Sequence, residues 1–245
     1  MPTLSLTEWI VVVVCAILLG ASKTGLVGAS TLYVPLMSTI FPAKESTGIL
    51  LPLLSFADIM GVALYRHHAR WGILLRLLPS TFAGIVAGYL CMRVISNEQL
   101  RPLIGALVLA MLALNLAMKR RTIEDDRSHA LIATGIGLLA GMFTMMANAS
   151  GPVMVLYLIF MRLDKTGFMG TIAWFYFIIN LAKIPFSAHL GLINPHSLWL
   201  NLLLAPAVVL GGWLGYLFVR WIPQKPFEIV MQALAALSAL YLLLP

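Results

Sequence analysis

The sequence predicts an all-α polytopic membrane protein with two inverted repeats, each a broken helical hairpin followed by three transmembrane helices. Composition is the first observation: 61% of the 245 residues are hydrophobic and 10% are charged, which would leave a soluble protein without a polar surface. The second is a pair of breaks, rich in small and polar residues, at matching places in two halves. The third is the distribution of basic residues, which orients the predicted loops.

The first half opens with two short apolar runs, at residues 9–22 and 26–41, around a break that contains Lys23. Each run is shorter than the roughly 20 residues with which a helix crosses a bilayer. Glycine, serine and threonine in the break expose backbone amides that hydrocarbon cannot satisfy, so the break must face protein, water or a ligand. Three runs of ordinary spanning length follow, at residues 47–65, 71–92 and 102–118.

The second half repeats this plan after a hydrophilic linker at residues 119–128. An apolar run at 130–146, a break at 147–152 and a short run ending at Met161 precede three spans, at 168–188, 198–219 and 227–244. The third long element ends alike in both halves, because Gly-Tyr-Leu-Cys-Met-Arg at 88–93 aligns with Gly-Tyr-Leu-Phe-Val-Arg at 215–220. We therefore expect two repeats, at residues 1–118 and 129–245.

Basic residues decide between two topologies. With four crossings in each half, seven basic loop residues fall on one side and six on the other. Such an even distribution does not favour either orientation of the protein in the membrane. If each break is the tip of a hairpin that enters and leaves on the same side, one side keeps only Lys44, Arg93 and Arg101. The other side then collects Arg66, Arg70, Lys119, Arg120, Arg121, Arg127, Arg162, Lys165, Arg220 and Lys225. The positive-inside rule places this second group in the cytoplasm, so each half crosses three times and both termini lie outside.

Several functional classes find no support in the sequence. The net charge of +7 does not indicate nucleic-acid binding, because the basic residues stand at the ends of apolar runs rather than in a patch. Cys15 and Cys91 lie in apolar segments and predict neither a disulfide nor a metal site. We find no His-Glu-x-x-His pair and no nucleophile with a nearby base, so we expect no enzyme activity, no cofactor and no metal. Since Glu8 is the only charge before Lys23, the first run lacks the basic flank of a signal peptide and is expected to stay in the mature protein.

Lys23 is the strongest candidate for a site residue. At the tip of a hairpin it lies near the middle of the membrane, whereas in a four-crossing topology it would snorkel to the far interface. A fixed charge beside the helix N-terminus that opens near Leu26 suits an anion, and Ser22 and Thr24 add a hydroxyl on either side. We expect all three side chains to bind substrate.

The second break and two of the spans supply the other candidates. Asn148 and Ser150 can donate to the oxygens of an anion or tie off the broken backbone, and both roles stay open. Lys183, with Asn180 one helical turn away, either joins the site or snorkels to the nearer interface. Asp58 lies inside its span, either as the partner of a buried cation or as a proton carrier that couples transport.

Three motifs resemble those of a known family. Gly-Ala-Ser-Lys-Thr-Gly-Leu-Val-Gly at 20–28 is followed by Val34 and Pro35, Asn-Ala-Ser-Gly-Pro occupies 148–152, and Gly-Thr-Ile-Ala-Trp-Phe-Tyr-Phe-Ile-Ile-Asn-Leu-Ala-Lys-Ile-Pro occupies 170–185. Over essentially its whole length the chain resembles the TauE/SafE family of sulfite and organosulfonate exporters. This resemblance implies secondary export of a small sulfur-containing anion, such as sulfite or sulfoacetate, without an ATP-binding part.

The residues themselves also predict a negatively charged substrate, because the spans contain two lysines and one carboxylate. We expect alternating access in a multi-pass protein of the inner membrane, with a small anion and the lipid bilayer as its partners. Proton coupling and homo-oligomerisation stay open. A passive anion channel is the closest alternative, and an intramembrane enzyme is a more distant one.

Overall fold

The computed structural model describes residues 4–96, 98–99, 126–223, 225–226, 229–230 and 233, and the regular structure in this part of the chain is helical, with no strand. The predicted all-α class is therefore confirmed. The elements in chain order are α1 (Leu6–Thr24), η1 (Val27–Ala29), α2 (Ser30–Ile40), α3 (Ala43–Tyr65), η2 (Arg66–His68), α4 (Trp71–Val94), α6 (Asp126–Ala147), α7 (Gly151–Phe160), α8 (Lys165–His189) and α9 (Pro195–Trp221).

Five described helices are long and apolar enough to cross a membrane: α1, α3 extended through η2, α4, α8 and α9. Large apolar side chains such as Leu75, Leu202 and Trp213 are exposed on these helices, as contact with lipid requires. The chain is thus a multi-pass membrane protein. The span predicted at 102–118, and all but three residues of the one predicted at 227–244, lie outside the described residues.

Short polar motifs begin three of the membrane helices. The Ser5 hydroxyl accepts a hydrogen bond from the Glu8 amide, and the Glu8 carboxylate accepts one from the Ser5 amide, which forms a capping box before α1. Asn194 and Ser197 make the same reciprocal pair before α9. Asp164 caps α8 by accepting from the Gly167 amide. These caps fix where the polar loops end and the apolar helices begin.

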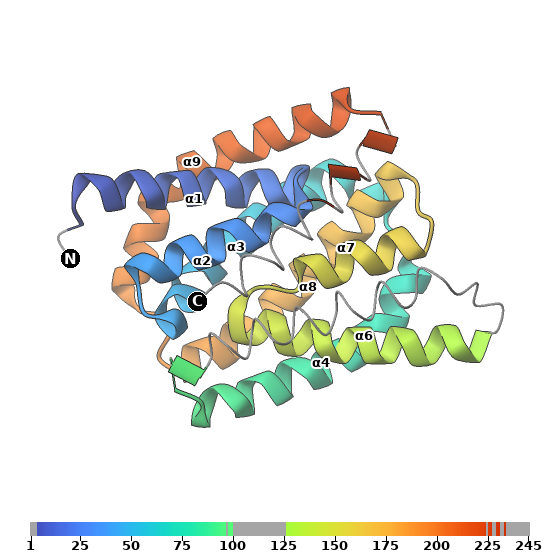
Figure 1. Cartoon of the computed structure of the whole chain (residues 1–245), viewed down its shortest axis with the longest axis horizontal. Helices are drawn as coiled ribbons and strands as arrows, with labels where there is room; N and C mark the ends of the chain where they lie inside the picture. Colours follow the sequence, from blue (N-terminus) through green and yellow to red (C-terminus); the bar gives the residue numbers. More distant parts are fainter. Residues whose placement is uncertain are drawn as a thin grey trace.

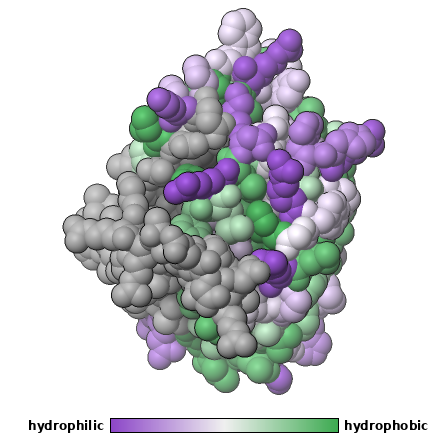
Figure 2. All heavy atoms as spheres, turned by 90° about the vertical axis from the view of Figure 1, so that its right-hand side faces the viewer, coloured by the Kyte–Doolittle hydropathy of each residue, from purple (hydrophilic) through white to green (hydrophobic). Residues whose placement is uncertain are grey.

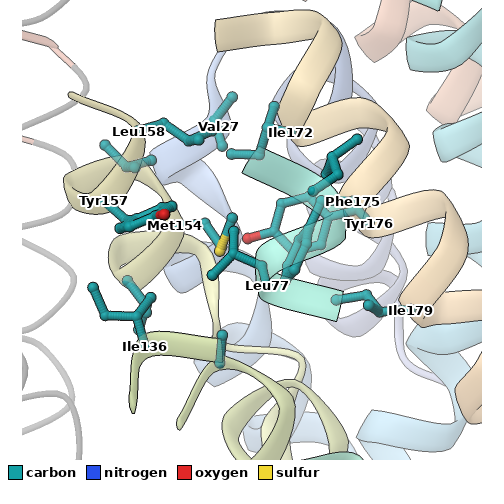
Figure 3. Close-up of a cluster of buried hydrophobic side chains, with 14 of the residues drawn as sticks. Val27, Leu77, Ile136, Met154, Tyr157, Leu158, Ile172, Phe175, Tyr176 and Ile179 are labelled. Atoms are coloured by element: carbon teal, nitrogen blue, oxygen red, sulfur yellow. The ribbon is translucent and has the colours of Figure 1, made fainter. Parts of the chain in front are cut away.

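Helices α1 and α2 form one hairpin, and α6 and α7 form another. The start of α1 and the end of α2 lie together, because Leu4, Trp9 and Phe41 line one surface cavity. In Figure 1, α6 and α7 enter from the opposite end of the bundle, and the tips of both hairpins lie inside it. Val27, at the tip of the first hairpin, belongs to the same buried cluster as Met154 and Leu158 of α7 (Figure 3). The inverted repeat itself stays a prediction, since one span of each half is largely outside the described residues.

The first helix of each hairpin packs against a helix from the other predicted repeat. Helix α1 lies along α9, and α6 lies along α4 (Figure 1). A Cβ atom added at Gly211 would stand 1.9 Å from the Ile17 carbonyl oxygen, and one added at Gly84 would stand 2.1 Å from the Leu138 carbonyl oxygen. Only glycine permits backbones to approach so closely, which is how helices associate when lipid removes the hydrophobic drive.

Charged loops gather at one end of the bundle. Arg70, after α3, forms an exposed ion pair with Asp164, before α8, at 3.5 Å. The Lys165 ammonium donates to the carbonyls of Val219 and Ile222 at the end of α9, both at 2.7 Å. Figure 2, in which the right-hand end of Figure 1 faces the viewer, shows hydrophilic side chains gathered on the upper part of this face. This grouping follows the predicted cytoplasmic face, although the orientation of the termini stays a prediction.

Candidate functional site

The first break lies between α1 and α2 and closes its own backbone. The amides of Gly25 and Leu26 both donate to the Ala21 carbonyl, at 2.9 and 2.8 Å. The Tyr65 hydroxyl donates to the Thr24 carbonyl at 2.9 Å, and the Thr24 hydroxyl donates to the Gly212 carbonyl of α9 at 2.6 Å. Thr24 therefore ties the break to α3 and α9, and its hydroxyl faces α9.

Lys23 and Asp58 form a buried ion pair beside this break. The Lys23 Nζ atom lies 2.8 Å from Asp58 Oδ1, and the two side chains are 7% and 1% exposed. Asn180 Nδ2 donates to Asp58 Oδ2 at 2.6 Å, and Lys23 Nζ lies 4.1 Å from the centre of the Tyr176 ring. A carboxylate and an ammonium withdrawn from water in this way persist only because each neutralises the other.

The second break, between α6 and α7, depends on a lysine from another helix. Asn148 has a left-handed backbone, with φ of 53°, and its amide donates to the Thr144 carbonyl. Lys183 Nζ, from α8, contacts Thr144 O and Oγ1 at 2.9 Å, Asn148 Oδ1 at 2.6 Å and Asn180 Oδ1 at 2.9 Å. All four oxygens are formally neutral. Lys183 thus adds a second donor to the Thr144 carbonyl at the C-terminal end of α6, where the helix dipole makes a cation favourable.

These contacts join the two breaks into one buried polar chain. Asn148 Nδ2 also donates to the Thr47 carbonyl of α3 at 3.0 Å. Thr47 and Asp58 are eleven residues apart on α3, which corresponds to about 16 Å along a helix axis. The chain runs through Thr47, Asn148, Lys183, Asn180, Asp58 and Lys23.

A small cavity lies beside this chain. Its volume of about 10 Å³ has room for about one water molecule. The Ser22 hydroxyl is turned to the Leu19 carbonyl, at 2.7 Å. The structure therefore shows the site in a closed state. The lining residues are Ser22, Lys23, Val27, Tyr33, Leu54, Thr144, Asn148, Tyr176 and Asn180.

Several donors around the breaks have few partners within the described part of the chain. The buried Ser150 and Tyr176 hydroxyls lie near each other, and neither has another hydrogen-bond partner among the described residues. The residues that precede α2 and α7, Ala29 and Ser150, make no side-chain capping hydrogen bond to the first turn. Two helix N-termini and two hydroxyls are thus left near the two breaks, and the amide ends of helices favour negative charge.

The structure brings together most of the residues singled out from the sequence. Lys23, Asp58, Asn148, Asn180 and Lys183 are joined by direct contacts, and Ser22 lines the cavity beside them. Thr24 faces α9, and Ser150 and Lys183 are not among the residues that line the cavity. Their roles toward a substrate stay predictions.

Sequence reasoning missed three residues of this site: Tyr33, Thr144 and Tyr176. A signal for two of them was available. Tyr176 precedes Asn180 by four residues on one helix, and Thr144 precedes Asn148 by four, so both share a face with a candidate. Tyr33 had no such signal, because it reaches the cavity from α2 across the break.

Two larger hollows lie at the opposite end from the charged loops. One, of about 380 Å³, is lined by Trp9, Phe41 and Trp199 among others. The other, of about 340 Å³, is lined by Lys44, Arg93 and His189 among others. Neither contains a residue of the buried polar chain, so the small closed cavity is where the intramembrane charges meet.

Comparison with known proteins identifies a family for this chain. No curated protein and no solved structure matches the chain. The family model described as sulfite exporter TauE/SafE matches residues 12–242, which is nearly the whole sequence. The chain therefore belongs to the TauE/SafE family of membrane transporters.

Proposed function

We propose that the protein is a secondary transporter that exports a small sulfur-containing anion, namely sulfite, sulfoacetate or a related sulfonate, across the inner membrane. The observation that carries the proposal is the charge of the buried chain. Lys23 and Lys183 are both inside the bundle, and Asp58 is the carboxylate in contact with the chain among the described residues. Their formal sum of +1 favours a negatively charged ligand, because the membrane interior penalises an uncompensated positive charge.

Lys23 supplies the main attraction in the proposed site. The Asn180 amide and the Tyr176 hydroxyl, which both line the closed cavity, are available as donors to the anion once the cavity opens. Ser22, Thr24, Asn148, Ser150 and Lys183 are the remaining proposed ligands, and those turned away in the closed state must rotate or move with their hairpin.

Alternating access is the proposed mechanism. The anion enters from the basic, cytoplasmic side and binds between the two breaks, and the two halves then rock to open outward. The small volume of the cavity, about that of one water molecule, supports this mechanism over a permanently open channel, which needs a continuous path. Proton coupling is proposed to act through Asp58, and a pH dependence of flux that persists unchanged in Asp58→Asn would remove that role.

The test is flux of labelled sulfite and of labelled sulfoacetate into proteoliposomes under an imposed pH gradient. We expect saturable flux that follows the gradient in the intact protein and disappears in Lys23→Ala. Asp164→Asn, a carboxylate change in the exposed loop before α8, is the control and should transport normally. Flux that never saturates and ignores uncouplers would indicate a channel, and no flux of either anion would contradict the proposed substrates.

A further inference from the structure

We propose that the Asp58 carboxylate occupies the place of the substrate on Lys23 in the closed protein, and that the transported anion displaces it. Asp58 would then be an internal competitor that holds the empty site closed. This inference rests on the proposed function and adds to it the residue that the substrate must replace.

The donors that Asp58 uses are the ones an oxyanion needs. One carboxylate oxygen meets Lys23 Nζ at 2.8 Å, and the other accepts from Asn180 Nδ2 at 2.6 Å. Sulfite and sulfonates also present oxygens that share a negative charge. An ammonium and an amide held by Asp58 cannot serve a second anion equally well, because charged hydrogen bonds are the strong ones in such a site.

The small size of the cavity also indicates that the anion must displace Asp58. Sulfite and sulfonates carry three oxygens around one sulfur atom and are larger than water, whereas the cavity beside Lys23 holds about one water molecule. With Asp58 and Lys23 in contact, no anion of this class fits. Separation of the pair frees the Lys23 ammonium, which lines this cavity.

A second lysine, Lys183, lies close enough to receive the Asp58 carboxylate. Asn180 lies between them: its Nδ2 contacts Asp58, and its Oδ1 contacts the Lys183 ammonium at 2.9 Å. Within the described part of the chain, Lys183 contacts neutral oxygens and no carboxylate in the closed state. With the substrate on Lys23 and Asp58 near Lys183, both lysines have an anion and no buried charge is left unpaired.

Movement of Asp58 from Lys23 to Lys183 would also change the contacts of the second hairpin. Lys183 holds the Asn148 side chain at 2.6 Å, and Asn148 in turn holds the Thr47 carbonyl of α3. A carboxylate is a stronger acceptor for an ammonium than an amide oxygen. Movement of Asp58 toward Lys183 would weaken the contact with Asn148, so anion binding at the first break would loosen the second.

The competing explanation is that the ion pair only holds α1 against α3. Removing the carboxylate would then leave the affinity for anions unchanged or lower it. Under the proposal, removing the competitor raises the affinity, because the binding-competent state no longer has to be reached by breaking the pair.

The experiment is calorimetric titration of the purified full chain with sulfite and with sulfoacetate. We expect the Kd of Asp58→Asn to be lower than that of the wild type by about tenfold or more, and the Kd of the control Asp164→Asn to be unchanged. A Kd in folded Asp58→Asn that is equal to or higher than the wild-type value overturns the inference and leaves the proposed function standing. Failure of the wild type to bind either anion counts against the proposed function, and the inference falls with it.

A second variant covers the case in which Asp58→Asn does not fold. Asp58→Ala leaves a gap of carboxylate size next to Lys23, which formate is small enough to fill. We expect formate to raise the Tm of Asp58→Ala and to have no such effect in the double variant Lys23→Met/Asp58→Ala. Absence of a formate-dependent shift in Asp58→Ala would contradict the assignment of an exchangeable anion position.

Discussion

The two breaks each have a buried lysine, but they use it differently. At the first break the lysine belongs to the broken helix itself, and a carboxylate neutralises it: Lys23 of α1 meets Asp58 of α3. At the second break the lysine comes from another helix, and neutral oxygens hold it: Lys183 of α8 meets the end of α6. The comparison teaches that one buried lysine is neutralised by a carboxylate, whereas the other binds carbonyl and amide oxygens at a helix end.

The backbone explains why the two breaks differ. At the first, Gly25 and Leu26 donate back to Ala21 and the Tyr65 hydroxyl satisfies the Thr24 carbonyl, so the end of α1 needs no cation. At the second, the Thr144 carbonyl accepts from both the Asn148 amide and Lys183. Lys23 is therefore free for another role, whereas Lys183 is engaged at the C-terminal end of α6.

The largest expected effect comes from Lys23→Met, which removes the cation in contact with the buried Asp58 carboxylate. We expect a loss of about 3–5 kcal/mol in the free energy of unfolding, the usual cost of breaking a buried pair from one side. Asp58→Asn in the same chain should restore most of this loss, because the uncompensated charge is then gone. Denaturant unfolding in detergent micelles measures both values, and failure of the second change to restore stability would contradict the pairing of Lys23 with Asp58.

The substitution Lys183→Met tests whether the two lysines differ in the charge of their partners. It removes the donor from Thr144, Asn148 and Asn180, and unsatisfied buried acceptors cost about 1–3 kcal/mol each, so we expect a loss of about 3 kcal/mol. Asp58→Asn should restore none of it, since the lost partners are neutral. If Asp58→Asn restored Lys183→Met as well as it restores Lys23→Met, the two lysines would not differ as described.

Two substitutions of Asn148 test whether the left-handed backbone of the second break has an energetic cost. Asn148→Ala loses the contacts with Lys183 and Thr47 and keeps a side chain at a φ of 53°, whereas Asn148→Gly loses the same contacts at a backbone that glycine adopts freely. We expect a loss of about 2 kcal/mol for alanine and about 1 kcal/mol less for glycine. Equal stability of the two variants would show that the left-handed backbone carries no cost.

The smallest effect is expected for Asp164→Asn, outside the membrane-spanning helices. The Thr166 hydroxyl, which donates to the carboxylate, lowers the pKa of Asp164 below its ordinary value, so the folded state is favoured above that range. Asparagine also caps helices, and the ion pair with Arg70 is exposed, so we expect a change within about 0.5 kcal/mol at neutral pH. This difference should vanish as pH falls through the lowered pKa, which unfolding at pH 7 and at pH 3 would check.

Local patterns in the sequence were sufficient for much of this fold. The apolar run predicted at 71–92 corresponds to α4, Trp71–Val94, and the break predicted at 147–152 separates α6 from α7. The proximity of Asn180 and Lys183 followed from helical spacing alone. Helix ends were less predictable: α3 begins at Ala43 and α6 at Asp126, because polar residues continue a helix beyond its apolar part at the membrane surface.

Contacts between distant segments could not be predicted in this way. Nothing near Thr24 in the sequence indicates that its hydroxyl turns to Gly212, and nothing near Lys183 indicates that it contacts the end of α6. The choice of Asp58 as the partner of Lys23 was one of two alternatives, because a carboxylate inside a span fits a structural pair and a proton carrier equally well. These contacts depend on which helices pack together, and no spacing within one segment encodes that.

The central claim is that Lys23 is the positive charge of an anion site, and the double variant Lys23→Met/Asp58→Asn tests it most directly. This variant removes the site charge together with its internal partner, so its folded fraction should stay close to that of the wild type. The measurement is saturable uptake of labelled sulfite and sulfoacetate into proteoliposomes that contain equal amounts of folded protein. The account predicts uptake in the wild type and its loss in the double variant, and equal uptake by both would contradict the account.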